Sequence, residues 1–217
     1  MRILHISKYY YPYLGGVENI CKYLVDNMPG YQMAVLCFNE RRKDQIDEVD
    51  DIKVYRVGTW INVARQALSP TYFTMLRRVL REFKPDIIHF HWANPYPAAV
   101  LLTMIPKQVK LVIHWHMDII KQKKIYPFIK PIEKKLLKRA NLILVTSPNY
   151  RDGSLSLQPF KEKIAIVPNA INEQNFALQS PGDDEKIAQI KQKYSGKPII
   201  FFIGRHIQYK GLPHLLK

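Results

Sequence analysis

The sequence predicts an α/β fold in which helices cover both faces of a parallel sheet. Short, continuously apolar runs recur along the chain, for example YQMAVLCF at 31–38. Segments with the apolar spacing of amphipathic helices lie between these runs, for example at 71–84. Strands that are buried on both faces are apolar throughout, and their alternation with helices is typical of parallel sheets. The 217 residues suffice for one such domain and part of a second.

A tyrosine-rich turn and two glycines join the first strand to the first helix. Residues 3–6 are expected to form the strand and 17–28 the helix. Gly15 and Gly16 lie between them, and Glu18 lies in the first helical turn. The first N–H groups of a helix lack partners and carry partial positive charge, and a glycine lets the backbone approach a phosphate or a sugar closely. The turn therefore fits an anion site, although a tight turn without a ligand explains two glycines equally well.

The rest of the chain continues this alternation. After the strand at 31–38, further strands are expected at 52–57, 86–91, 109–116, 141–146, 163–167 and 198–203. Helices are expected at 71–84, 94–104, 118–139 with a break near Pro127 and Pro131, and 184–194. The charged segment 39–51 lacks periodicity and is expected to be a surface loop. Ligands bind beyond the carboxyl ends of parallel strands. That edge of the sheet should gather Gly15, Gly16, His91, His116, Ser147 and Asn169.

Charge and composition restrict the partners and the compartment. Lys and Arg number 33 against 18 Asp and Glu, and the net charge of +15 indicates a negatively charged partner. Nucleic acid is not expected, because no RNP, zinc-finger or helix-turn-helix pattern is present. Cys21 and Cys37 form no CxxC pair and indicate buried thiols in a reducing compartment. Without a signal-peptide core or an apolar run of about 20 residues, we expect a cytosolic protein.

The last residues of the sequence have the pattern of the start of a second domain. The helix at 184–194 and the apolar run at 198–203 resemble the entry to a second α/β domain. We therefore expect residues 1–180 to form an N-terminal domain and residues 181–217 to hold a linker helix and the truncated start of a C-terminal domain. The alternative is that the run at 198–203 completes the first sheet.

Six motifs, in this order, resemble the retaining glycosyltransferases of family 4. They are LGGVE at 14–18, PDIIHFH at 85–91, HWHMDII at 114–120, TSPNY at 146–150, VPNAIN at 167–172, and FIGR at 202–205 with KG at 210–211. These enzymes have the GT-B fold, in which two Rossmann-like domains face each other across a cleft. The resemblance implies that this chain holds the N-terminal, acceptor-binding domain with its Rossmann-like parallel sheet. The stretch 114–124 most resembles the branch that builds bacterial surface polysaccharides.

The resemblance also implies roles for the matching residues. Gly15 and Gly16 would close over the diphosphate and sugar of the donor. Arg205 and Lys210 would hold the diphosphate, whose negative charge grows as it leaves. His116 would touch the sugar in the transition state. Contacts to the acceptor are expected from Glu18, His91, Asp118 and Ser147. Ala170 and Asn172 depart from the family pattern, where glycine and aspartate are usual.

The implied reaction is transfer of a hexose from a nucleoside-diphosphate sugar to a glycan or lipid-linked acceptor in surface polysaccharide synthesis. The anomeric configuration would be retained, and neither a metal nor another cofactor would be required. The paired glutamates of the family, which contact the donor, would lie beyond Lys217, so this chain alone is expected to be inactive. A non-catalytic subunit that binds the acceptor or a membrane is an alternative.

Four histidines offer a competing chemistry. His89 and His91 share one face of a strand, and His114 and His116 have the same spacing on another strand. Four imidazoles at one sheet edge suit a transition metal and hence a metal-dependent hydrolase. The spacing matches no common zinc motif, and no Asp or Glu joins the group. Core packing is the alternative for His89 and His114.

A basic helix within 118–139 predicts a membrane contact. Lys130, Lys134 and Lys138 lie on one helical face, with apolar residues on the other side. Such a face suits an anionic bilayer and predicts a peripheral protein at the inner, cytoplasmic face of the cell membrane. The alternative is a solvated face on a helix whose apolar side packs against the domain.

Overall fold

The chain forms two units, each described here by itself. The structure is a computed structural model that describes residues 1–64, 66–120, 124–171, 173, 180–195, 197–204, 206 and 211–215. Unit one comprises Met1–Asn169 and unit two Ala170–Lys217. No helix in these ranges is both long and apolar enough to cross a bilayer.

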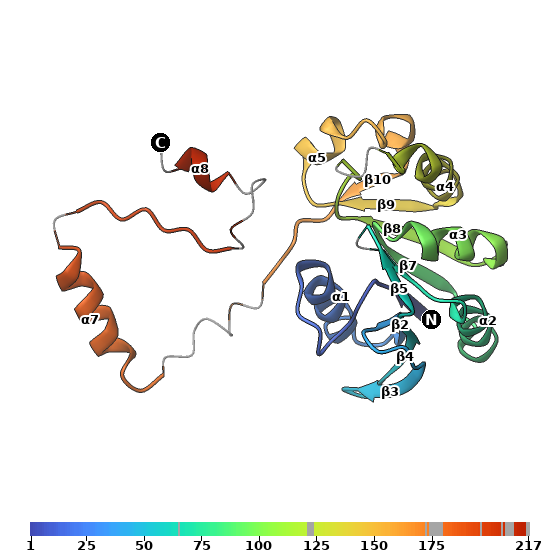
Figure 1. Cartoon of the computed structure of the whole chain (residues 1–217), viewed down its shortest axis with the longest axis horizontal. Coiled ribbons are helices and arrows are strands. Elements are labelled where there is room, and N and C mark those ends of the chain that lie inside the picture. The colour runs from blue at the N-terminus through green and yellow to red at the C-terminus, as the bar shows by residue number, and fades with distance from the viewer. Residues whose placement is uncertain are drawn as a thin grey trace. The chain divides into compact units, whose positions relative to one another are not determined.

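Unit one is built on an eight-stranded sheet with the order β10-β9-β8-β7-β1-β2-β4-β3 (Figure 1). Its strands are β1 (Arg2–Ile6), β2 (Gln32–Asn39), β3 (Gln45–Val49), β4 (Ile52–Gly58), β7 (Ile87–Trp92), β8 (Lys110–Trp115), β9 (Leu142–Val145) and β10 (Ile164–Ile166). Every pairing is parallel except that of the edge strand β3 with β4. The predicted parallel sheet is therefore confirmed.

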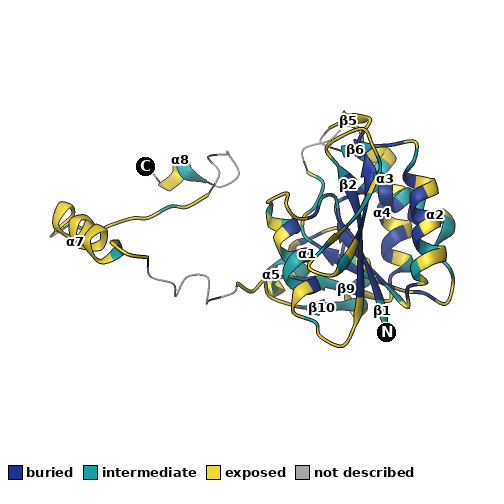
Figure 2. Ribbon diagram, turned by 90° about the horizontal axis from the view of Figure 1, so that it is seen from below, coloured by how far each residue is buried: buried dark blue, intermediate teal, exposed yellow. Residues whose placement is uncertain are grey.

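Helices cover both faces of the sheet (Figure 1). They are α1 (Gly16–Asp26), α2 (Tyr72–Phe83), α3 (Pro95–Met104), α4 (Tyr126–Arg139), α5 (Pro148–Gly153) and the 3-10 helix η1 (Gln158–Lys163). The row α2–α3–α4 seals one face, where the larger core lies. On the other face α1 packs Cys21 and Val25 against a smaller core on β1, β2 and β4. Figure 2 shows the buried strands between these helices.

The strand order has a switch point between β1 and β7. The chain leaves β1 toward β2 and β4, then returns to β7 on the other side of β1 and continues outward. In open parallel sheets, ligands bind at the carboxyl ends of the two strands that flank such a point. This rule directs attention to the ends of β1 and β7 and to the start of α1.

Two short pairings were not expected from the sequence. The segment 39–51 was predicted to be a surface loop, yet it contains β3. Asp47 of β3 pairs with the buried Arg56 of β4 at 2.9 Å, and Arg56 also donates to the carbonyl of Tyr11 at 2.7 Å. The strand is hidden in the sequence because an edge strand can carry charge on its exposed side. A second, two-stranded sheet joins β5 (Ile61–Val63) and β6 (Gln66–Leu68).

Helix α4 is shorter and more continuous than predicted. It begins at Tyr126, whereas the sequence suggested a start at Asp118, and it contains Pro131 without a break. Pro127 is the second helical residue, where the missing N–H has no partner to lose, whereas Pro131 leaves the carbonyl of Pro127 without its helical donor. Lys121 and Lys123 of the predicted helix lie outside the described residues.

Unit two contains the helices α7 (Asp183–Lys193) and α8 (Leu212–Leu215). The helix predicted at 184–194 is confirmed as α7. The prediction of a strand at 198–203 is wrong, because these residues adopt no strand conformation in the structure. Ile200, Phe201 and Ile203 are at least 75% exposed. A strand requires a hydrogen-bonded neighbour, and the described residues of unit two supply no ladder for it.

Candidate functional site

The glycine pair opens α1, at the end of the loop 7–15 that follows the carboxyl end of β1. Gly15 is the N-cap, with an extended backbone and no capping side chain, and Gly16 is the first helical residue. A Cβ on Gly15 would collide with the carboxylate of the buried Glu18, whereas a Cβ on Gly16 would meet no atom within 4 Å. The space over Gly16 at a helix N-terminus therefore fits the predicted approach of an anionic ligand.

Five histidines form a contiguous array on the face that α1 covers. The array consists of His5, His89, His91, His114 and His116, from β1, β7, β8 and the residue after β8. Register places His5 opposite His89 and His91 opposite His114. The rings are stacked or tilted, with centroids 4.2 to 5.6 Å apart for neighbours such as His114–His116 and His5–His91. The predicted shared face of the four later histidines is confirmed.

Burial keeps the array uncharged. Desolvation is the main cause that lowers the pKa of His5 and His116 to about 3 and that of His114 to about 4, and neighbouring imidazoles add to it for His5 and His116. The pKa values of His89 and His91 lie well below the usual value for the same reasons. Since protonation would place charges side by side in a dry interior, the rings are neutral at pH 7.

Two hydrogen bonds run through the array toward the carboxyl edge. His5 Nδ1 lies 3.2 Å from His91 Nε2, and His91 Nδ1 lies 3.0 Å from His116 Nε2. Among the five, only His116 is partly exposed. His91 was expected to contact the acceptor, but its ring is fully buried and both of its nitrogens are engaged. The geometry suits a residue that holds His116.

Asp118 and Ser147 lie near the same edge but are turned toward the protein. Asp118 accepts from Trp115 Nε1 at 2.9 Å and from Ser154 Oγ at 2.8 Å. Ser147 caps α5, since its Oγ accepts from the N–H of Tyr150 at 3.2 Å. Both carry hydrogen bonds that order the loops beyond β8 and β9.

The remaining predicted residues lie elsewhere or are not described. Lys130, Lys134 and Lys138 are exposed on α4, whose Leu136 and Leu137 are buried in the larger core. Arg205 and Lys210 lie outside the described residues.

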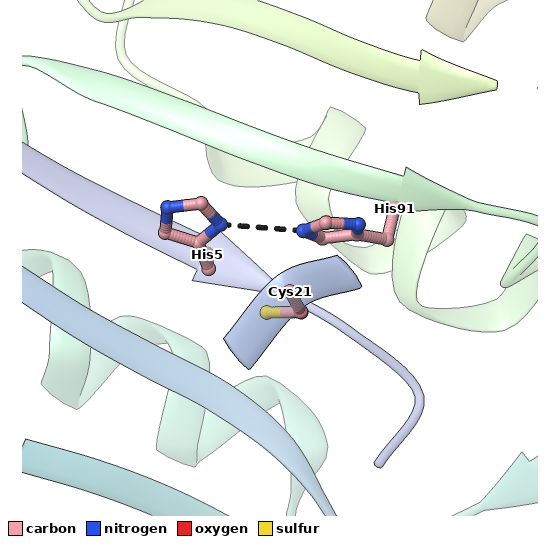
Figure 3. Close-up of side chains that lie close together, drawn as sticks. All are labelled: His5, Cys21 and His91. Carbon is pink, nitrogen blue, oxygen red and sulfur yellow. Dashed lines mark hydrogen bonds between the residues drawn. The ribbon is translucent and has the colours of Figure 1, made fainter. Parts of the chain in front are cut away.

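Sequence reasoning missed His5 and Cys21. His5 is the one polar side chain in the apolar run ILHI, and that interruption was a readable signal. The register of β1 against β7 then brings it to His89 and His91. Cys21 of α1 has its sulfur within 4.8 Å of ligand atoms of His5 and His91 (Figure 3). That contact could not be read from spacing, because it joins a helix to two strands.

The fold of unit one and the residues at the carboxyl edge of its sheet together indicate a class of protein. An open, mostly parallel sheet with helices on both faces and a glycine turn at its switch point is a Rossmann-like arrangement. The model of glycosyltransferase family 4 matches residues 14–175, so the chain belongs to this family. Its fold is that of an N-terminal domain of a GT-B glycosyltransferase.

Relatives and solved structures agree with this assignment. The chain is 25% identical over 219 residues to the O-antigen chain mannosyltransferase C of Escherichia coli, covering all of this chain and 57% of that protein. It is 24% identical over 220 residues to the D-rhamnosyltransferase WbpZ of Pseudomonas aeruginosa, again over its whole length and 56% of that protein. The chain thus spans somewhat more than half the length of these relatives.

Two solved structures share the fold. The sucrose-phosphate synthase of Thermosynechococcus elongatus matches with a TM-score of 0.67 at 17% identity, over 99% of this chain and 58% of the other. HepE from Anabaena, in complex with UDP-glucose, matches with a TM-score of 0.57 at 19% identity, over 99% and 57%.

Proposed function

We propose that this chain is the acceptor-binding half of a retaining glycosyltransferase. The protein that contains it would transfer a hexose from a nucleoside-diphosphate sugar to a glycan or lipid-linked acceptor of a surface polysaccharide. The two relatives above act in O-antigen assembly or transfer rhamnose by name, and HepE is named as a complex with UDP-glucose. These names support the substrate class without deciding which sugar is moved.

One observation carries the proposal. The turn at Gly15 and Gly16 opens at the carboxyl edge beside the switch point, and the hydrogen-bonded histidines lead from β1 to His116 at that same edge. The N–H groups at a helix N-terminus suit the diphosphate, and a neutral imidazole suits a sugar hydroxyl. We assign His116 to the sugar, Gly15 and Gly16 to the donor diphosphate, and Arg205 and Lys210 to the same diphosphate. No step of this scheme requires a metal.

The acceptor would approach the same edge. Glu18, in the first turn of α1, remains a candidate for contact with an acceptor hydroxyl. Asp118 and Ser147 fit a supporting role better, because each already accepts a hydrogen bond from the protein. We propose that residues 1–180 act as the acceptor domain and that residues 181–217 lead into the donor domain.

A donor screen tests the function. The natural protein that contains this chain is incubated with nucleoside-diphosphate hexoses and a lipid-linked glycan, and the anomer of the product is determined. We expect transfer with retention of configuration and its loss in His116→Leu. His89→Leu, the same substitution at a ring that makes no hydrogen bond within the described part of the chain, is the matched control. Absence of transfer from every donor contradicts the proposal, and an inverted product contradicts retention.

We also propose that α4 rests on an anionic membrane surface at the cytoplasmic face. Lys130, Lys134 and Lys138 are exposed on one side of the helix, and Phe128 near its start is 78% exposed. Leu136 is committed to the core, so the contact would be electrostatic and shallow. This arrangement would bring the acceptor edge near a lipid-linked glycan.

Vesicle binding tests the membrane contact. Each Lys near an anionic surface contributes about 1 kcal/mol, so Lys130→Glu, Lys134→Glu and Lys138→Glu together should lower binding to phosphatidylglycerol vesicles by at least about 100-fold. The matched control changes three exposed cations in the same way, Arg77 and Arg81 of α2 and Lys84 at its C-cap. Equal losses in both triple variants would show a non-specific charge effect and would contradict a specific role for α4.

A further inference from the structure

Three of the five histidines form a continuous hydrogen-bonded row, which we call the histidine relay. It consists of His5, His91 and His116. The first link joins His5 Nδ1 to His91 Nε2 at 3.2 Å (Figure 3), and the second joins His91 Nδ1 to His116 Nε2 at 3.0 Å. The inner end is His5 Nε2, which is buried and has no partner among the described residues. The outer end is Nδ1 of His116.

Neutral imidazoles restrict how protons can be arranged in this row. A neutral ring carries one N–H and one bare nitrogen, so it donates through one nitrogen and accepts through the other. Two joined links therefore have the same direction. If His5 donates to His91, then His91 donates to His116, and His116 carries its proton on Nδ1. In the reverse direction, His116 donates through Nε2 and its Nδ1 is bare.

The inner end decides between these directions. With the outward direction His5 Nε2 is a bare nitrogen, whereas with the reverse direction it is a buried N–H without an acceptor. An unpaired N–H in a dry interior is rarer than an unpaired acceptor.

We propose that His5 and His91 are positioning residues that fix the tautomer of His116, so that His116 presents a protonated Nδ1 to its ligand. His116 then acts as a neutral hydrogen-bond donor to an oxygen of the sugar. Only the identity of the ligand rests on the proposed function, because the direction of the relay follows from this chain alone. The relay also explains why a histidine lies on β1, where an aliphatic residue would pack without an unpaired nitrogen.

A bound metal is the competing interpretation. Two sets of side chains each bring their ligand atoms within 4.8 Å of one another: His5, Cys21 and His91, and His89, His91 and His114. The first set needs bare nitrogens on both histidines and a thiolate, and the second needs a bare nitrogen on His91. The relay already occupies the facing nitrogens of His5 and His91, and burial holds the Cys21 thiol protonated. The observations therefore favour the relay, and metal binding becomes an outcome of the test.

Nitrogen NMR on the full 217-residue chain tests the relay without any substrate. Long-range proton–nitrogen spectra of protein labelled in its histidines show which nitrogen of each ring carries the proton. At pH 7 we expect His5, His91 and His116 each to be protonated on Nδ1 only. A His116 proton on Nε2, a charged ring or an exchanging mixture would overturn the proposal. Stoichiometric binding of added zinc that shifts His5 and His91 would also overturn it.

Two substitutions at His5 sharpen the test. His5→Leu removes the inner donor, and we expect His116 to lose its single tautomer. His5→Asn keeps a donor near the position of Nδ1 and should restore it. His89→Leu is the matched control, since His89 stacks on His5 and His91 but is not part of the relay. An unchanged His116 tautomer in His5→Leu contradicts the relay. If His5→Leu does not fold, the wild-type and His5→Asn spectra still decide.

Kinetics on the natural protein separate the relay from the proposed function. His5→Leu should lower kcat by roughly 10- to 100-fold, by analogy with the loss when the group that orients a metal-binding histidine is removed, and leave KM unchanged. His5→Asn should recover most of it. Absence of transferase activity in the wild type, with the expected tautomers in the spectra, refutes the function and leaves the relay intact. Full activity in His5→Leu refutes the positioning role.

Discussion

The two faces of the sheet in unit one are made from the same strands but serve different purposes. On β7, Phe90 and Trp92 enter the larger core beneath α2–α3–α4, while His89 and His91 point to the face of α1. The first face is apolar and closed. The second places neutral imidazoles with unpaired nitrogens at the switch point of the sheet. A protein retains such costly groups where it has a use for them, so the difference between the faces itself indicates where function lies.

Low pH should have the largest effect on stability, because it acts on the histidine face and not on the apolar face. The pKa of each array histidine is lowered by folding, so from about pH 6.5 downward the unfolded chain binds protons that the folded chain does not. Stability therefore falls as the pH falls, by about 1.4 kcal/mol per pH unit for each histidine. With five of them, we expect unit one to unfold between about pH 6 and 4.

Urea unfolding at pH 7, 6 and 5 measures this slope. The variant His89→Leu should reduce the proton uptake by one. Glu133 acts in the opposite direction, because burial raises its pKa and falling pH then favours the folded state, but it is a single group. A stability that stays flat between pH 7 and 5 would show that the array is charged or exposed.

Neighbouring positions on β7 should then differ in stability. Phe90→Ala opens a cavity in the larger core and should lower the free energy of unfolding by about 3–5 kcal/mol. His89→Leu, one residue earlier, replaces an imidazole whose Nε2 is buried without a partner in the described structure. We expect this change to lie within about 1 kcal/mol of the wild type at pH 7. Urea unfolding of both variants checks the comparison, and a large loss in His89→Leu would mean that the ring has a partner.

The sequence was sufficient for the closed face and for most of the fold. Continuous apolar runs predicted the buried strands, and spacing predicted α2, because these patterns record burial directly. The edge strand β3 was missed, because its stability comes from pairing with β4 and from the Asp47–Arg56 contact. The prediction of a strand at 198–203 was wrong for the opposite reason. Its apolar pattern is typical of a strand, but without a neighbouring strand it forms no hydrogen-bonded ladder.

The histidine face of the sheet could be predicted only in part from the sequence. Alternation within one strand gave the shared face of His89 and His91, and motif likeness singled out His116. The link through His5 depends on the register between β1 and β7, which no local pattern records. Resemblance also assigned His91 to the acceptor, whereas burial shows that it lies behind His116. Local patterns thus indicate which residues face one way, while pairing decides which of them touch.

The smallest effects on stability should come from the glycine pair, and they separate packing from binding. At Gly15 an added Cβ meets the tip of the Glu18 side chain, which can rotate away, so Gly15→Ala should lower the free energy of unfolding by about 0.5–1 kcal/mol. At Gly16 the space is open, so Gly16→Val should stay within about 0.5 kcal/mol of the wild type.

In the natural protein, however, Gly16→Val should weaken donor binding, because the valine fills the room that the diphosphate would need. Thermal unfolding of this chain and calorimetric titration of the natural protein with nucleoside diphosphate measure the two quantities separately. Unchanged donor affinity in Gly16→Val would remove this turn from the donor site, even if the acid and core predictions hold.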